Sequence, residues 1–341
     1  MPRQFEITTR QGEIPLASNI TASLKFNEVI YNFNGSKAAL INNTSIFIIE
    51  LDRNNMYEIT NPDMTRIKSI AFSKDNRYLV ALGYHQLNTR STNITAIVKE
   101  YDLSQFTVEH KTYEYTISRN EWNDINSINR IKLTDDGNYF AFVTKNNTIS
   151  IYNRQNGDNV INFNSNEILF FTFLSSDYTD IIVNYNRDNR LGLFRFQNNR
   201  YTQVAGVINE DADIPFYKLL ISPNKLYIYI SYVNKTNSYK TDILKLDSHT
   251  FEQLSLKVVD TDISDFVGVT NETLIAFNFE NQINFFDLNN QGDLTSRRIQ
   301  QTINTSNFDY NVPRLSNSNT LLVIKPNENK TRIIYTIYRF N

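Results

Sequence analysis

The sequence predicts an all-β protein built from one repeated unit of strands and turns. Tyr and Phe suit pleated, half-buried strands, and the chain of 341 residues holds 23 Phe and 20 Tyr beside a single Trp. A second observation is the stretch "IKLTDDGNYFAFVTKNNTISIYNRQNG" at residues 131–157, where strand-like runs alternate with polar turns. A third is that the same order of runs returns along the chain.

Each segment of residues 131–157 has its own signal. The dipeptide "DG" at residues 136–137 favours a tight turn, because Gly tolerates a positive φ and Asp bonds to nearby backbone. "NN" at residues 146–147 gives the second turn. The run "YFAFV" between them is apolar throughout, as expected for a strand covered on both faces. "TISIY" then alternates, with Ile149 and Ile151 on one face.

Six further segments repeat this order of entering strand, turn, apolar strand, turn and alternating strand. They cover residues 23–52, 67–103, 168–196, 217–247, 263–288 and 308–340. The first turns of the seven copies fall at Gly35, Asp75, Asp136, Asp177, Asn224, Asn271 and Asn317. The differences between these positions are 40, 61, 41, 47, 47 and 46 residues. Spacings in the forties indicate a β-propeller with one blade per repeat.

The prediction is therefore a single β-propeller domain over residues 1–341, with WD40-like four-stranded blades. Seven blades are predicted, with eight or nine as alternatives. The long spacing is attributed to residues 104–126, an insertion between the second and third repeats that carries an extra fourth strand, "KTYEYTI". The strand "QFEITT" at residues 4–9 is expected to be the outer strand of the last blade. Such closure removes free strand edges.

Composition excludes several classes of chemistry. The chain has no Cys, so disulfides and Cys-based metal or redox sites are excluded. A net charge of −2 with interspersed signs gives no global case for nucleic-acid binding. His85, His110 and His249 are far apart in sequence and are expected to be ordinary surface or core residues. No signal peptide and no long apolar run occurs, so a cytoplasmic protein without membrane contact is expected.

Local signatures of an enzyme are missing from the sequence. The acidic pairs at residues 135–136 and 210–211 stand in turn contexts, where Asp chemistry explains them. "DTDISD" at residues 260–265 lacks the glycine and closing glutamate of a calcium-binding EF-hand loop. There is no Gly-rich phosphate loop and no G-x-S-x-G nucleophile elbow. A non-enzymatic protein without cofactor or metal is expected.

Residues in the predicted insertion and turns are candidates for contact with a partner. Trp122 and Arg119 stand in "SRNEWND", and a Trp beside an Arg can stack on a base or anchor a protein partner. Packing at a blade edge is the plainer explanation of Trp122. Basic pairs at turns would sum to a phosphate-binding face if they converge on one rim, although solvated turn charges explain each pair. The pairs are Lys74 with Arg77, Arg187 with Arg190, Arg297 with Arg298, and Lys330 with Arg332, and Lys235 is a further candidate for partner contact.

The order of these segments resembles the eukaryotic translation initiation factor 2A family, a single-chain propeller factor. "QFEITTRQGEIPL" is similar to the N-terminal strand of that family, and residues 29–51 and 69–103 are similar to its first two blade repeats. "SYVNKTNSYKTDILKL" resembles a further stretch of the family through Lys235, Thr236, Ser238 and Tyr239, and "DISDFVGVTNETLIAFNFENQINFFDL" resembles a later blade. The chain lacks the Gly-Tyr-Met-Pro-Ala and Gly-Phe-Gly-Asn signatures of the family.

The resemblance implies a ribosome-associated factor of translation initiation without enzymatic activity. The implied partners are the small ribosomal subunit, through its rRNA and proteins, and also initiator tRNA or mRNA. Other protein partners are compatible with it, and a monomer is expected off the ribosome. The alternative function is a generic WD40-like scaffold for protein–protein interaction, unrelated to translation, because propellers host many unrelated functions.

Overall fold

A computed structural model describes the protein over most of its length. The described residues are 7–15, 29–32, 34–42, 44–53, 55–85, 92–105, 108–118, 131–144, 148–164, 168–185, 190–208, 218–233, 241–259, 261, 263–270, 273–278, 282–295, 301–304, 320–326 and 332–340. Every regular element in these ranges is a β-strand, apart from the single 3-10 turn η1 (Leu103–Gln105). No helix in this part of the chain is long and apolar enough to cross a membrane.

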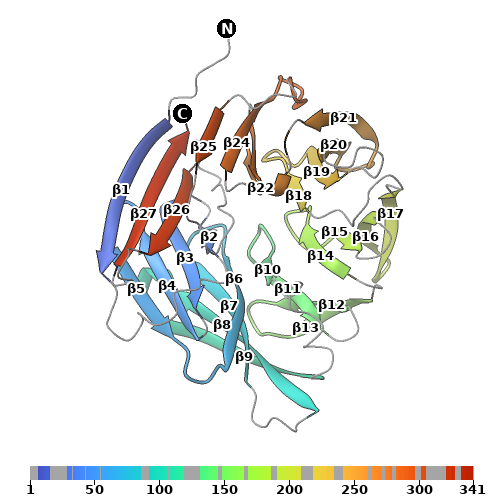
Figure 1. Ribbon diagram of the computed structural model, residues 1–341. Helices are drawn as coiled ribbons and strands as arrows, with labels where there is room; N and C mark the ends of the chain where they lie inside the picture. Colours follow the sequence, from blue (N-terminus) through green and yellow to red (C-terminus); the bar gives the residue numbers. More distant parts are fainter. Residues whose placement is uncertain are drawn as a thin grey trace. The chain divides into compact units, whose positions relative to one another are not determined.

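Contacts divide the chain into two compact units. One unit consists of Lys25–Tyr185 and Phe194–Gln203, and the other of Met1–Leu24, Asn186–Leu193 and Val204–Asn341. In six of the seven described sheets, the strands follow one another in the sequence, and Figure 1 shows them as successive groups of arrows; the remaining sheet pairs β1 with β27. The single domain predicted from the sequence remains a prediction.

The first four sheets contain four strands each, in chain order. The first is β2 (Val29–Tyr31), β3 (Lys37–Asn42), β4 (Ser45–Glu50) and β5 (Asn55–Thr60). The second is β6 (Arg66–Phe72), β7 (Tyr78–His85), β8 (Asn93–Asp102) and β9 (Val108–Ser118). The third is β10 (Lys132–Leu133), β11 (Tyr139–Thr144), β12 (Thr148–Asn153) and β13 (Asn159–Asn164). The fourth is β14 (Ile168–Phe173), β15 (Asp180–Tyr185), β16 (Arg190–Gln197) and β17 (Arg200–Ile208).

Three further sheets follow. The fifth is β18 (Lys218–Ile221), β19 (Tyr227–Val233), β20 (Thr241–Asp247) and β21 (Gln253–Val259). The sixth is β22 (Ile263–Val269), β23 (Thr273–Asn278), β24 (Gln282–Asp287) and β25 (Gln301–Asn304). The last has three described strands in the order β1 (Ile7–Pro15), β27 (Arg332–Phe340) and β26 (Thr320–Pro326).

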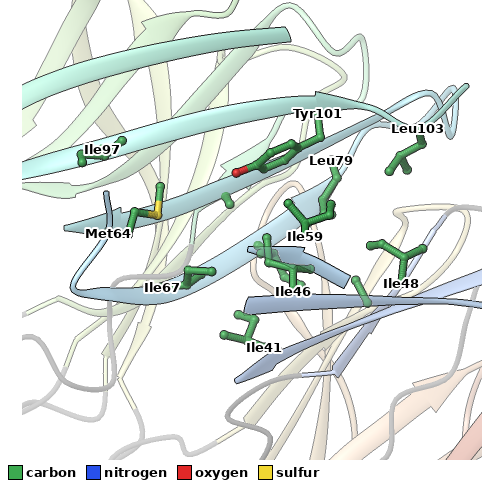
Figure 2. Packing of buried hydrophobic residues seen from close by; sticks show 13 residues of the cluster. Ile41, Ile46, Ile48, Ile59, Met64, Ile67, Leu79, Ile97, Tyr101 and Leu103 are labelled. Atoms are coloured by element: carbon green, nitrogen blue, oxygen red, sulfur yellow. The ribbon is translucent and has the colours of Figure 1, made fainter. Parts of the chain in front are cut away.

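Neighbouring sheets bury apolar side chains against each other. Between the first and second sheets, Ile46 and Ile48 of β4 belong to one cluster with Leu79 of β7 and Tyr101 of β8, as Figure 2 shows. Burial of one such aliphatic side chain contributes about 1.5–3 kcal/mol. The Tyr101 hydroxyl donates a hydrogen bond to the Asn61 side chain, so its polar atom is satisfied inside the cluster.

Strand β11 shows why the central strands are apolar on both faces. Phe140 and Phe142 pack in a cluster with the second sheet, while Ala141 and Val143 pack in a cluster with the fourth. The prediction that "YFAFV" is a strand covered on both faces is confirmed. A similar cluster joins the fifth and sixth sheets. The sheets joined by these clusters thus depend on one another, as in other repeat proteins.

Several sequence predictions can be compared with these strands. The first turns predicted around Asp75, Asp136 and Asp177 do connect the first two strands of their sheets. The N-terminal strand pairs antiparallel with β27, from Ile7 opposite Phe340 to Pro15 opposite Arg332, which confirms its place beside the last strand. It continues to Pro15, beyond the predicted end at residue 9, and residues 4–6 of the prediction lie outside the described residues. The turns predicted at Asn271 and Asn317 lie outside the described residues.

The explanation of the long repeat at residues 104–126 needs correction. The strand "KTYEYTI" exists as part of β9, but it is not extra, because five other sheets also have a fourth strand. Outer strands such as β13 and β17 are exposed along much of their length. They therefore lack the apolar runs that mark the inner strands in the sequence.

Candidate partner-binding site

A hydrogen-bonded turn recurs between the first and second strands of the sheets. In the second sheet, the Asp75 carboxylate accepts from the Arg77 amide at 3.0 Å, and the Ser73 hydroxyl accepts from the Tyr78 amide at 2.9 Å. Thr134 and Asp136 make the equivalent bonds in the third sheet. Asp and Asn favour such turns because their short side chains satisfy nearby amides.

Equivalent side chains occupy this turn in three further sheets. They are Asn32 and Asn34 in the first sheet, Ser175 and Asp177 in the fourth, and Ser222 and Asn224 in the fifth. The prediction that Asp136 serves turn structure is therefore confirmed.

Four of these turns are joined into one continuous surface. The Asn34 amide donates to the Asn76 side chain at 3.2 Å, which links the first sheet to the second. Lys74 lies 3.5 Å from the Asp135 carboxylate, which links the second sheet to the third. The Asp136 amide donates to the carbonyl of Ser176 at 2.8 Å, which links the third to the fourth. We call residues 34–36, 73–77, 134–138 and 175–179 the turn arc.

An aromatic ring at the arc lies close to two guanidinium groups. The Tyr78 ring centre is 4.9 Å from the Arg77 guanidinium carbon and 4.6 Å from that of Arg154. The His110 ring stacks on Tyr78 at 5.6 Å between centroids. Cations over an aromatic face are attracted by its quadrupole. We call Arg77, Tyr78, His110 and Arg154 the Tyr78 cluster.

Two buried carboxylates of β8 hold the guanidinium groups in place. Arg77 donates through Nε and Nη2 to Asp102 at 3.1 and 3.0 Å, and Arg154 donates through Nη1 to Glu100 at 3.1 Å. Hydrogen bonds from the Ser104 hydroxyl and amide, followed by that of Arg77, lower the pKa of Asp102 from 3.8 to about 2. The two acids are buried, since the side chains of Glu100 and Asp102 are 2% and 5% exposed. The Arg77 side chain remains accessible at 53% exposed, whereas that of Arg154 is only 19% exposed.

The main chain of Arg154 is also fixed from the neighbouring sheet. The Tyr113 hydroxyl donates to the Arg154 carbonyl at 2.6 Å, and the Lys111 ammonium donates to the Gln155 carbonyl at 3.1 Å. The cluster is thus assembled from the β6–β7 turn, strand β9 and the turn after β12. These contacts make it a rigid, mixed-charge surface with an aromatic centre.

The structure places only some of the residues predicted to contact a partner. Lys74 and Arg77 lie together on the turn arc, and Arg190 lies at the start of β16, half-buried and in a different sheet. Trp122, Arg119, Arg187, Lys235, Arg297 and Arg298 lie outside the described residues. Glu210, Asp211, Asp260 and Asp262 also lie outside them.

Sequence reasoning missed Tyr78, His110 and Arg154 as one group. These residues come together only because neighbouring sheets pack against each other. In the sequence, the one sign that pointed to any of them was that Arg154 stands in a predicted turn. In the described part of the chain, no group of three or more His, Asp or Glu residues is arranged to hold a metal ion.

The comparisons with known proteins identify the fold. No protein-family model matches the sequence, and no curated protein matches it either. Solved structures match in large number, with 1438 chains in total. One of them, from "Crystal Structure of Mitotic Checkpoint Complex", has a TM-score of 0.66 and 11% sequence identity, and the match covers 99% of this chain and 93% of that chain. The protein has a β-propeller fold. At this identity the likeness concerns the fold alone, and the four-stranded sheets are its blades.

Proposed function

We propose that the protein is a non-enzymatic β-propeller scaffold that binds a protein partner through the turn arc and the Tyr78 cluster. The proposal includes a closed ring of seven blades, with the β1–β27 pairing as its closure. The observation that carries the binding function is that the cations are already paired. Lys74, Arg77 and Arg154 each lie against a carboxylate of the same chain. A surface built to neutralise phosphates keeps its cations available for them.

The chemistry of the cluster favours a protein partner. Tyr and Arg are enriched among the residues that contribute most to protein–protein affinity, because they combine apolar area with hydrogen-bond donors. Pre-ordered side chains also lose less conformational entropy on binding. The structural match to a chain of a mitotic checkpoint complex agrees with the use of this fold in protein assemblies, without naming a partner for this chain.

Affinity purification with paired variants tests the proposal. Lys74→Ala with His110→Ala removes exposed side chains from the arc and the cluster. Arg53→Ala with His249→Ala removes an exposed Arg and an exposed His from other turns. We expect the first double variant to lose the proteins recovered with the wild type and the second to retain them, while both keep the wild-type circular dichroism spectrum. Equal recovery with both double variants would refute the assignment of this site.

A second candidate function is ribosome association in translation initiation. The observation that favours it is the order of segments resembling initiation factor 2A, from "QFEITTRQGEIPL" to "QINFFDL". The proposed partners are then the small ribosomal subunit, initiator tRNA or mRNA. Sucrose-gradient fractionation at low salt tests it, because an electrostatic contact with rRNA produces co-migration that is lost as salt rises. A protein that never enters the subunit or ribosome fractions excludes this function.

A further inference from the structure

One edge of an arginine in the Tyr78 cluster is available to a ligand. An arginine side chain has five N–H donors in one plane. The Arg77 guanidinium uses the edge formed by Nε and Nη2 to bind the Asp102 carboxylate, at 3.1 and 3.0 Å. The second edge, formed by Nη1 and the other Nη2 hydrogen, has no acceptor among the residues that the structure describes. Because Asp102 is buried and the Arg77 side chain is largely exposed, this second edge is the one that a partner can reach.

Two neighbours of this edge also keep polar atoms that no described residue uses. Arg154 binds Glu100 only through Nη1, so its Nε and Nη2 donors remain. The His110 ring makes no hydrogen bond to a described residue, because its Nε2 lies 3.8 Å from the Glu100 carboxylate, which is too far for one. The two guanidinium groups and the imidazole all contact the Tyr78 ring. Their remaining donors therefore belong to one compact patch.

The charges of this patch are arranged in two layers. The carboxylates of Asp102 and Glu100 are buried, whereas the Arg77 side chain lies largely in solvent. A further cation, Lys111, donates to main-chain carbonyls at 3.1 and 3.4 Å and pairs with no described carboxylate. One oxygen of the exposed Asp75 carboxylate is engaged in its own turn, where it accepts from the Arg77 amide. The outer layer is therefore more positive than the inner one, which favours an anionic group of the partner.

We propose that the partner presents an Asp or Glu side chain whose carboxylate accepts two hydrogen bonds from the second edge of Arg77, beside the Tyr78 ring. The planar edge of a guanidinium matches the two oxygens of a carboxylate. A phosphate has close to two negative charges where a carboxylate has one, so the buried Asp102 and Glu100 carboxylates repel it more strongly. The contact rests on the proposed function, since it names the group that the partner brings to the Tyr78 cluster.

Short random peptides displayed on phage, selected against the immobilised full chain, are the probes. The enriched peptides should contain an acidic residue, and replacing its carboxylate by the amide of the same shape should weaken binding of the synthetic peptide by at least about tenfold. Arg77→Gln should weaken the acidic peptide by a similar factor and should not weaken the amide peptide further, because both changes remove one contact. Arg53→Gln is the matched control, since the Arg53 side chain is 75% exposed and outside the cluster.

Arg77→Lys is a second variant, which keeps the charge without the planar edge. It should also bind the acidic peptide more weakly than the wild type does, with an unchanged circular dichroism spectrum.

The outcomes distinguish this contact from the binding site itself. Peptides without an acidic residue that still lose binding to the double variant Lys74→Ala with His110→Ala would overturn the carboxylate contact and leave the proposed site standing. Peptides that bind this double variant as tightly as the wild type would overturn both. The contact would also be overturned by equal affinities of the acidic and amide peptides, by unchanged affinity of Arg77→Gln, or by tighter binding of a phosphoserine in place of the acidic residue. A selection that enriches no peptide would contradict it as well.

Discussion

The hydroxyl group of Tyr115 donates a 3.0 Å hydrogen bond to the main-chain carbonyl of Gly157, from one blade to the next. Tyr115 is on β9, and Gly157 lies in the turn between β12 and β13. Burial raises the pKa of Tyr115, so the hydroxyl keeps its proton as a donor in neutral solution. Because Tyr113 bonds to the Arg154 carbonyl of the same turn, the two tyrosines hold the main chain from which the Arg154 side chain reaches the Tyr78 cluster.

The same arrangement occurs between the fifth and sixth blades. The Tyr229 hydroxyl donates to the Gly292 carbonyl at 2.8 Å. The buried Lys245 ammonium lies 2.8 Å from the Asp293 carboxylate and 4.0 Å from the Tyr227 ring centre. In both places, Tyr and Lys donors of one blade hold the turn after the third strand of the next blade. This contact supplements the apolar clusters between blades with directional bonds.

Replacement of Gly157 by Ala should destabilise the fold more than replacement of Gly137. A Cβ at Gly157 would overlap the Tyr113 ring, and the backbone there has φ of +77°. A positive φ and this overlap together should cost about 2–4 kcal/mol. Gly137 has φ of +70° with no atom within 4 Å of its Cβ position, so Gly137→Ala should cost only about 1–2 kcal/mol.

Urea unfolding of both variants measures this difference in the free energy of unfolding. A lower urea concentration at the midpoint, with an unchanged dependence of the free energy on urea, reports the loss of stability. Equal losses would show that the Tyr113 contact relaxes without cost. A loss confined to Gly137→Ala would contradict the role of Gly157 in joining the blades.

Local chemistry explains which parts of the fold were predictable from sequence. The turns at Asp75 and Asp136 depend on bonds within five residues, so the residue types alone indicate them. The inner strands are apolar on both faces and are equally clear. Outer strands such as β17 were not predicted as strands, because exposure along them removes the apolar alternation.

The candidate site depends on contacts that no short segment contains. Tyr78, His110 and Arg154 belong to three separate segments in two blades, and each has an ordinary local explanation. The sequence correctly placed Lys74 and Arg77 on one turn. It did not indicate that Asp135 and Asp102 pair with them, because those carboxylates reach the cations only through blade packing.

Lys74→Ala should leave stability almost unchanged. Lys74 and Asp135 are 3.5 Å apart with side chains 47% and 36% exposed. Exposed ion pairs contribute little, so the coupling energy should be below about 0.5 kcal/mol and should fall further in high salt. A double-mutant cycle with Asp135→Ala, measured by urea unfolding, gives this coupling energy directly. A value above about 2 kcal/mol would show that the pair fixes the turn arc, and loss of partner binding by Lys74→Ala would then reflect altered structure.

Asp102→Asn should destabilise the protein at neutral pH and lose this effect in acid. The pKa of Asp102 is lowered from 3.8 to about 2 in the folded protein, so the folded state favours the charged carboxylate. Its contribution is fully present above the unfolded pKa and is lost as the pH falls from about 4 to about 2. The wild type should therefore lose more stability than Asp102→Asn across this window, in thermal unfolding followed by circular dichroism.

Ser104→Ala provides the control for the cause of this shift. Ser104 supplies the hydroxyl bond of 2.6 Å to Asp102, whereas Arg77 remains in place. Because the hydroxyl bond is the largest contribution that lowers the pKa of Asp102, its loss should move the acid transition to higher pH. A stability difference between the wild type and Asp102→Asn that does not change with pH would contradict this account. The Asp102 carboxylate would then hold Arg77 by its shape and hydrogen bonds rather than by its charge.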